Sequence, residues 1–326
     1  MNKTVNNHIP VMLDQIKNFI PINKKLNVID ATFGGGGYSK FILNEYKVNK
    51  LIAIDRDPIT QIFAKEIKEK FKEKFELING CFSKIDKLIN TVISKNEKKL
   101  KFDLVIFDLG LSSNQLEDSK RGFSFEKEGP LDMRMGNSKI IASDIINSFS
   151  EKEIEKILFN YGNEKFARKI AKKIINYRKL EIINTTSELV NIITKSIPSV
   201  KSKKDKIHPA TRTFQALRIY VNDELNELKL ALEKSEKLLS TKGKLLLVSF
   251  QSLEDKIVKD YFNHKSGKKR RSSRHYPDLA EQGPITLKLI TKKPLRPTDN
   301  EIELNPRCRS AKLRVAEKTK LESRTL

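Results

Sequence analysis

Residues 30–39 read DATFGGGGYS, and this stretch decides the fold. The apolar run that leads into it, residues 27–32, is typical of a short buried strand, and a helix pattern follows the glycines. A strand that runs into glycines and then into a helix lets a ligand approach the backbone where a side chain would block it. Taken alone, the loop is equally typical of a tight turn without a ligand.

Three further apolar runs follow in the first third of the chain. They cover residues 51–55, 75–80 and 102–108, and the segments between them are polar with helical spacing, as in residues 59–71. Continuous Val, Ile and Leu runs separated by helices are typical of parallel strands that are covered on both faces. The first third is therefore predicted to be an α/β sheet.

The second strand ends at Asp55, eighteen residues after Gly37. A carboxylate in that position can accept hydrogen bonds from both hydroxyls of a ribose, so with the glycine loop it predicts a bound nucleoside. The dinucleotide fingerprint requires a third glycine where this chain has Ser39, which disfavours NAD and FAD, and no Walker sequence occurs. S-adenosylmethionine has no phosphate to bind, and its cationic sulfonium would favour Asp30 and Asp108 as neighbours.

The middle third of the chain has helical patterns only. A capping box occupies residues 150–153, and residues 185–188 open another helix. Between them lies an apolar stripe with lysines on the other face. The stripe consists of Phe166, Ile170 and Ile174, and the lysines are Lys169, Lys172 and Lys173. We therefore expect an all-helical block with no strand between about residues 118 and 200.

Strand patterns return in the last third. A long helix pattern over residues 214–232 leads to a buried-type strand at 243–250, and residues 285–291 and 311–316 are predicted to form a final pair. The economical organisation is one α/β domain interrupted by a helical insert. We predict a discontinuous sheet domain of residues 1–117 plus 213–326, and an inserted helical domain of residues 118–212.

The chain of 326 residues has 64 Lys and Arg against 41 Asp and Glu, a formal net charge of +23. Lysine accounts for 49 of the basic residues, so an AT-rich genome explains part of this excess. Residues 201–326 alone carry +14, against +5 for 1–117 and +4 for 118–200. This uneven distribution indicates a nucleic-acid partner, with a merely solvated basic surface as the alternative.

Composition also excludes several classes of protein. No stretch approaches about 18 uncharged apolar residues, which a membrane-spanning helix needs, and the N-terminus has no apolar signal core. Cys81 and Cys308 cannot build a disulfide framework, and the four histidines have no metal-site spacing. We therefore expect a cytoplasmic protein without a metal and without a membrane partner.

The sequence resembles the bacterial small-subunit ribosomal RNA cytidine N4-methyltransferases, the MraW/RsmH family. The likeness covers nearly the whole chain in order, from residues 8–11 through the glycine loop and residues 55–58 to the motifs downstream. The downstream motifs are residues 108–115, 121–125, 129–135, 208–215, 249–255 and 305–312. The resemblance implies a class I (Rossmann-like) methyltransferase sheet with an inserted helical substrate-recognition domain. It also implies S-adenosyl-L-methionine as methyl donor and a cytidine in the decoding region of 16S ribosomal RNA as acceptor.

The resemblance further implies the assembled small ribosomal subunit as substrate, while the oligomeric state stays open and includes a homodimer. Carried over by motif, the cofactor contacts are Gly36, Gly37, Tyr38, Asp55, Phe82, Asp108 and Gln115. The chain departs from the family pattern at three positions, where the family usually has His, Pro and His. These are Tyr38, Asn114 and Gln251. Since glutamine cannot be an obligatory proton acceptor, we interpret position 251 as hydrogen-bonding or structural.

The catalytic prediction starts from the acceptor amine, whose lone pair is delocalised into the cytosine ring. An oxygen acceptor at hydrogen-bond distance localises that lone pair and then takes the proton. Residues 108–113 stand where many amino-methyltransferases have an (Asp/Asn/Ser)-Pro-Pro-aromatic loop. We predict Asp108 as acceptor or orienter with Ser112 or Ser113 assisting, and the alternative is that Asp108 only holds the cofactor. Methylation at carbon 5 needs a nucleophilic cysteine, and neither Cys81 nor Cys308 has the usual Pro-Cys setting.

Contacts to RNA phosphates are predicted for Arg134, Arg212, Arg307 and Arg309, because guanidinium groups can bind phosphate through two hydrogen bonds. The basic loop of residues 264–276 could add attraction that weakens with salt. Phe123, Phe125 and Phe214 are candidates for stacking on an extruded base, with core packing as the plainer interpretation. Two other functions remain at this point: RNA binding without catalysis, and methylation of another RNA atom such as a 2′-hydroxyl.

Overall fold

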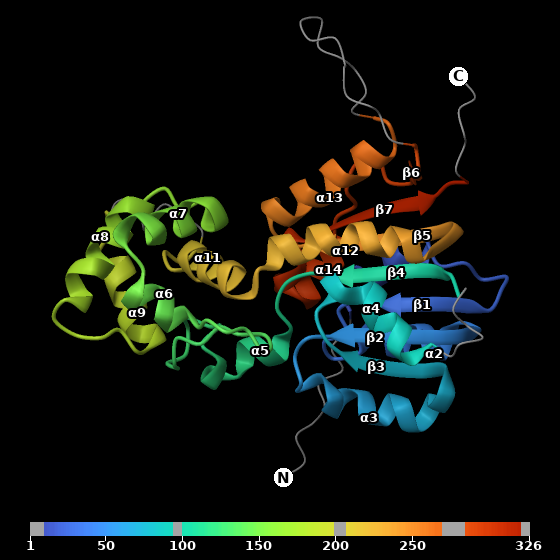
Figure 1. Cartoon of the computed structure of the whole chain (residues 1–326), viewed down its shortest axis with the longest axis horizontal. Helices are drawn as coiled ribbons and strands as arrows, with labels where there is room; N and C mark the ends of the chain where they lie inside the picture. The colour runs from blue at the N-terminus through green and yellow to red at the C-terminus, as the bar shows by residue number, and fades with distance from the viewer. Residues whose placement is uncertain (1–9, 94–99, 199–206, 269–283, 321–326) are drawn as a thin grey trace, which may run out of the picture. The chain divides into compact units, whose positions relative to one another are not determined.

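The computed structural model describes residues 10–93, 100–198, 207–268 and 284–320 (Figure 1). Contacts within the chain divide it into two compact units. The first comprises Met1–Gly110 with Leu225–Leu326, and the second comprises Leu111–Glu224. Among the described residues, no helix is long and apolar enough to cross a membrane.

The first unit is built on a seven-stranded sheet with the strand order β3-β2-β1-β4-β5-β7-β6. Strands β1 to β5 are parallel to one another, while β7 is antiparallel to both β5 and β6. The strands are β1 Leu26–Asp30, β2 Val48–Asp55, β3 Phe75–Asn79, β4 Phe102–Asp108, β5 Leu239–Ser249, β6 Leu287–Leu289 and β7 Lys312–Lys318. The predicted class I methyltransferase sheet is thereby confirmed.

Successive side chains of a strand point to opposite sides of the sheet. In these strands the side chains on both sides are apolar and buried, so each face of the sheet has its own hydrophobic core. Val28 belongs to one hydrophobic core and its neighbour Ile29 to the other. The helices that flank the strands are α1 Leu13–Lys17, α2 Gly37–Glu45, α3 Thr60–Phe71, α4 Ile85–Val92, α12 Glu224–Leu238, α13 Ser252–Lys265 and α14 Asp299–Leu304. The described part of this unit also contains the short 3₁₀ helices η1 Lys72–Lys74, η2 Phe82–Lys84 and η5 Pro306–Ser310.

The strand order reverses between β1 and β4, which are neighbours in the sheet. In open α/β sheets, ligands bind outside the carboxyl ends of the strands at such a switch point. Here those ends are Asp30 of β1 and Asp108 of β4. The fold therefore places two carboxylates where a ligand is expected.

The second unit is helical, and its described residues contain a single isolated β-bridge, between Pro130 and Thr185. Its helices are α5 Ser113–Glu117, η4 Ser119–Arg121, α6 Ala142–Ser148, α7 Glu151–Gly162, α8 Ala167–Arg178, α9 Thr186–Thr194 and α11 Thr211–Asn222. The capping boxes predicted at Ser150 and at Thr185 are both present. One hydrophobic core holds these helices together.

One predicted element is wrong. The single helix expected over residues 214–232 is divided into α11 and α12, because Asp223 adopts a φ of 50°, which a right-handed helix cannot include. Residues 111–117 and 213–224, assigned from the sequence to the sheet domain, lie in the helical unit. Of the expected basic loop, His264 and Lys265 close α13, while residues 269–276 lie outside the described residues, as do residues 8 and 9.

Candidate active site

The glycine loop follows β1 and ends as α2 begins at Gly37. Gly36 has a φ of 78° and Gly34 one of 54°, in the left-handed region that glycine adopts without strain. A Cβ atom on Gly36 would lie 2.7 Å from the ring of Phe33, whereas one on Gly35 would meet nothing within 4 Å. The loop thus needs glycine at position 36 for its own conformation, and at position 35 its backbone faces open space.

Asp55 at the end of β2 is attached to this loop. Its Oδ2 accepts a hydrogen bond of 2.7 Å from the backbone N–H of Gly34, and its Oδ1 accepts one of 2.9 Å from that of Asp57. Burial raises the pKa of Asp55 to about 6, although these two hydrogen bonds favour the ionised form. Each carboxylate oxygen has a second lone pair, so the predicted ribose contact remains chemically open.

Three carboxylates form an acidic cluster in the first unit: Asp30, Asp108 and Glu254. Burial, together with the charges of Asp30 and Glu254, raises the pKa of Asp108 to about 8. Burial also raises the pKa of Asp30 to about 6, opposed by a 2.7 Å hydrogen bond from the Ser39 hydroxyl. Such a cluster is suited to a cationic ligand, which would relieve the mutual repulsion of the carboxylates.

Asp108 differs from its neighbours in its hydrogen bonding. Its backbone N–H donates to Oγ1 of Thr32 at 2.6 Å, which fixes the end of β4 against the glycine loop. Its side-chain atom Oδ1 is buried and has no hydrogen-bond partner within the described part of the chain. A buried acceptor without a partner is costly, which indicates a group that awaits a ligand.

Glu254 is held by the turn that precedes α13. Its Oε2 accepts hydrogen bonds from the backbone N–H groups of Phe250 and Gln251, at 3.1 and 3.3 Å. The Gln251 amide donates to Oε1 at 2.8 Å. Gln251 therefore occupies the N-cap position of α13 and orients Glu254, as a hydrogen-bonding position would.

Tyr38 and Phe82, both predicted cofactor contacts, pack differently. Tyr38 is buried, and its hydroxyl donates to the backbone carbonyl of Val11, so it connects α2 to the N-terminal segment. Burial and the charges of Asp108 and Asp30 raise the pKa of Tyr38 well above its ordinary value. Phe82 is half-buried and meets Phe107 edge to face, with ring centroids 5.6 Å apart. Gly36, Gly37, Tyr38, Asp55, Phe82 and Asp108 thus all lie in the first unit.

The remaining predicted cofactor and catalytic residues lie on α5, in the helical unit. Ser112 and Gln115 form a capping box there. The Gln115 N–H donates to Ser112 Oγ at 3.3 Å, and the Ser112 N–H donates to Gln115 Oε1 at 3.1 Å. These residues, with Ser113, follow Asp108 by four to seven positions along the chain.

The four arginines predicted to contact RNA have unequal surroundings. Arg134 binds Asp132 through Nε and Nη2 at 2.8 and 2.7 Å, and these bonds keep the pKa of Asp132 below its ordinary value despite partial burial. Arg212 is half-buried beside a cavity of about 20 Å³ in the helical unit. Arg307 and Arg309 are exposed on η5 of the first unit.

Two of the candidate aromatic side chains pack in the helical core. Phe123 and Phe214 are buried, as the plainer interpretation expected. Phe125 stacks on the exposed His208, with ring centroids 4.7 Å apart and planes 11° apart, and meets Phe214 edge to face. His208 Nδ1 accepts a 3.2 Å hydrogen bond from the Ala210 N–H, which fixes the orientation of its ring.

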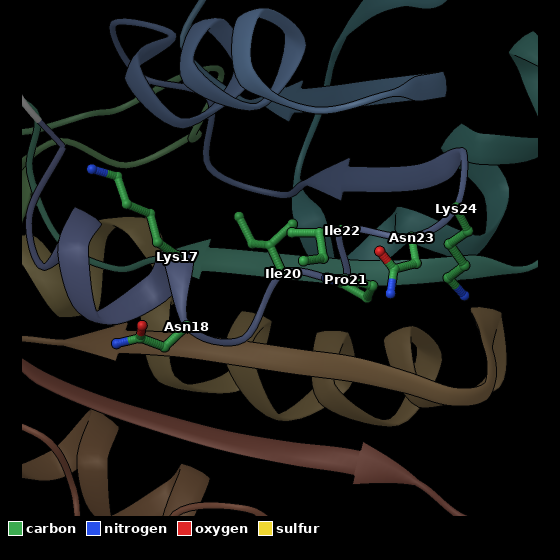
Figure 2. A pocket seen from close by; sticks show the side chains of 7 residues that line it. All are labelled: Lys17, Asn18, Ile20, Pro21, Ile22, Asn23 and Lys24. Carbon is green, nitrogen blue, oxygen red and sulfur yellow. The ribbon is translucent and has the colours of Figure 1, made fainter.

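A larger surface pocket, of about 560 Å³, lies along the segment that links α1 to β1. Figure 2 shows Lys17 and Lys24 at opposite ends of its lining. None of the predicted site residues lines it. The pocket includes neither the carboxyl ends of the strands nor the acidic cluster, so we do not assign it to the candidate site.

Sequence reasoning missed three contributors to the site. Thr32 and Ser39 lie in the quoted loop, but nothing in their sequence indicates that they hydrogen-bond to Asp108 and Asp30. Glu254 had a detectable signal, because it follows the N-cap residue Gln251 by the three positions of a capping box.

Comparisons with known proteins bear on this site. A family model described as the MraW methylase family matches residues 5–319. The ribosomal RNA small subunit methyltransferase H of Rickettsia akari is 44% identical over 312 residues, covering 95% of this chain and 98% of its own. The protein of the same name from Rhodospirillum rubrum is 39% identical over 323 residues, covering 98% and 96%.

Among solved structures, an rRNA methylase from Streptococcus thermophilus aligns over 92% of this chain and 90% of its own, with 10% identity and a TM-score of 0.39. The N-methyltransferase NodS from Bradyrhizobium japonicum, solved with S-adenosyl-L-homocysteine, aligns over 94% and 85%, with 6% identity and a TM-score of 0.39. These alignments are too loose to assign any residue a role.

Proposed function

Because the chain belongs to the MraW methylase family, we propose that it transfers a methyl group from S-adenosylmethionine to the N4 amine of a cytidine in small-subunit (16S) ribosomal RNA. The enzyme class is an rRNA (cytosine-N4)-methyltransferase. The observation that carries the chemistry is the buried, unpartnered Oδ1 of Asp108 at the end of β4.

The residues of the first unit fit S-adenosylmethionine. When bound, the cofactor supplies a methyl group on a cationic sulfur, and the cluster of Asp30, Asp108 and Glu254 favours a cation. The loop around Gly36 brings backbone rather than side chain toward the ligand, and Asp55 stands at the strand end that suits a ribose. We propose as cofactor contacts Gly36, Gly37, Tyr38, Asp55, Phe82, Asp108 and Gln115.

We assign Asp108 the role of proton acceptor. With a pKa of about 8, its carboxyl is mostly neutral in the ligand-free protein at pH 7, and a neighbouring cation favours the ionised form. Ionised, Oδ1 can accept a hydrogen bond from the amine, localise the nitrogen lone pair and take the proton as the nitrogen becomes tetrahedral. Ser112 or Ser113 is proposed to assist as a hydrogen-bond partner. Transfer from a sulfonium needs no Lewis acid, so no metal takes part in this proposal.

We propose that the unit Leu111–Glu224 recognises the RNA and that the assembled small subunit is the substrate. Arg212, Arg307 and Arg309 are proposed to contact phosphates. Arg134 is the weakest of the predicted contacts, because its guanidinium is already bound to Asp132.

The test combines nucleoside mass spectrometry with one substitution. Purified protein incubated with small subunits and S-adenosylmethionine is expected to produce N4-methylcytidine. Asp108→Asn is expected to lower kcat by about 100-fold or more, the usual contribution of a general base, with a much smaller change in cofactor affinity. Equal losses in both would reduce Asp108 to a cofactor contact. A 2′-O-methylated product, or no cofactor affinity at all, would contradict the proposed function.

A further inference from the structure

Helix α8, in the helical unit, has an exceptional charge distribution. Residues 165–179 contain seven of the fifteen basic residues of segment 118–200 and none of its eleven acidic residues. The rest of that segment is therefore net −3, so the modest total of +4 conceals a local concentration. Codon bias toward lysine would have affected the neighbouring helix α7 equally, yet α7 contains three glutamates and two lysines.

The exposed basic residues of α8 lie mainly on one face. Lys169, Lys172 and Lys179 follow one another at intervals of three and seven residues, which places them along one side of α8. Lys165 precedes them in the turn before the helix. We call these four residues the basic stripe. All four are exposed, and within the described part of the chain none of their side-chain ammonium groups forms an ion pair or hydrogen bond. Ile170 and Ile174 pack the opposite face into the core.

This arrangement opposes the stability of the helix itself. Lys169 lies in the first turn of α8, where the helix dipole favours acidic residues, and that turn contains none. By contrast, the first turns of α7 and α9 contain glutamate. Like charges three residues apart on a helix, as in Lys169 and Lys172, also repel one another. A local arrangement that costs stability without a compensating contact indicates a function outside the helix.

We propose that the basic stripe of α8 binds the phosphate backbone of double-helical RNA, an inference that rests on the RNA-methylating function proposed above. The two aromatic side chains of this segment, Phe166 and Tyr177, are half-buried against the helical core, so neither offers the stripe an open ring on which a single-stranded base could stack. From Lys169 to Lys179 it extends about 15 Å, and a nucleic-acid double helix presents several phosphates over that length. The contact is independent of RNA sequence and adds to binding at the catalytic site.

The test compares two triple variants of the full chain that lose the same charge. Lys165→Gln/Lys169→Gln/Lys172→Gln removes most of the stripe. Lys139→Gln/Lys152→Gln/Lys156→Gln removes three exposed lysines elsewhere in the same unit. Binding to a fully paired RNA hairpin and to the small subunit is measured between 50 and 200 mM salt. Thermal unfolding confirms that both variants fold, and the stripe variant is expected to be at least as stable as the unaltered protein.

Loss of three phosphate contacts lowers the slope of log Kd against log salt by about 2 to 3. The unaltered protein should then lose about 15 to 60 times more affinity over this salt range than the stripe variant does. The control variant should behave like the unaltered protein. Equal behaviour of the two variants would overturn the proposal, and so would a loss confined to the small subunit, which would indicate a protein partner. Methylation by the unaltered protein is measured separately, so a failure of the proposed function can be distinguished from a failure of the basic stripe to bind RNA.

Discussion

The backbone N–H of Gly34 donates a hydrogen bond of 2.7 Å to Oδ2 of Asp55. The carboxylate predicted to bind a ribose therefore also fixes the glycine loop to the end of β2. Any substitution of Asp55 acts on loop conformation as well as on ligand contact. This dual role decides how the binding site has to be tested.

For Asp55, the informative change is to asparagine, tested with two ligands. S-adenosylhomocysteine should bind the unaltered protein about 10- to 150-fold more tightly than its 2′-deoxy analogue, since a hydrogen bond to a charged group contributes about 1.5–3 kcal/mol. In Asp55→Asn that ratio should approach one, as measured by isothermal titration calorimetry. An unchanged ratio would assign Asp55 to the loop alone.

For the glycine loop, Gly36→Ala is predicted to lower the free energy of unfolding by about 2 kcal/mol. The left-handed conformation costs about 1–2 kcal/mol for a residue with a Cβ, and that Cβ would lie 2.7 Å from Phe33. Gly35→Ala is the matched control, because its Cβ would meet nothing within 4 Å. Denaturant unfolding of the two variants should differ clearly, and equal stabilities would contradict the argument.

The raised pKa of Asp108 predicts a pH dependence of stability in the ligand-free protein. The folded-state pKa is about 8 and the ordinary value 3.8, so between these values the folded chain binds the extra proton. The contribution of Asp108 to the free energy of unfolding is fully present below about pH 4 and declines as the pH rises toward 8. Asp108→Asn removes this decline. The melting temperature of this variant should therefore exceed that of the unaltered protein by more at pH 8 than at pH 5. An equal difference at both pH values would contradict the raised pKa of Asp108.

Arg134 and Arg309 should respond in opposite ways to alanine substitution. Arg134→Ala removes the two side-chain hydrogen bonds to Asp132 and should lower stability by up to about 1 kcal/mol, because the pair is partly exposed to solvent, with little effect on the salt dependence of RNA binding. Arg309 is exposed, so Arg309→Ala should leave stability unchanged and reduce that salt dependence by about one phosphate contact. Chemical denaturation and RNA titrations distinguish the two variants. A reduced salt dependence of RNA binding in Arg134→Ala would contradict this prediction and assign Arg134 a phosphate contact.

The sequence by itself determined the strands, the parallel type of β1 to β4, the glycine loop and the capping boxes. These depend on local rules: buried parallel strands need continuous apolar runs, and helix ends need side chains that accept backbone N–H groups. The family resemblance rested equally on the order of motifs, which folding does not alter. The break at Asp223 escaped prediction because the apolar spacing on either side of it continues as though the helix were unbroken.

Only the tertiary structure decided which polar groups meet. Asp30, Asp108 and Glu254 lie far apart in the sequence, and only the sheet brings their charges close enough to raise the pKa of Asp108. Likewise, only the folded chain shows that Arg134 is held by Asp132 while the lysines of the basic stripe have no such partner. Burial and pairing are properties of contacts between distant residues, so the sequence could name the candidate groups without fixing their protonation or availability.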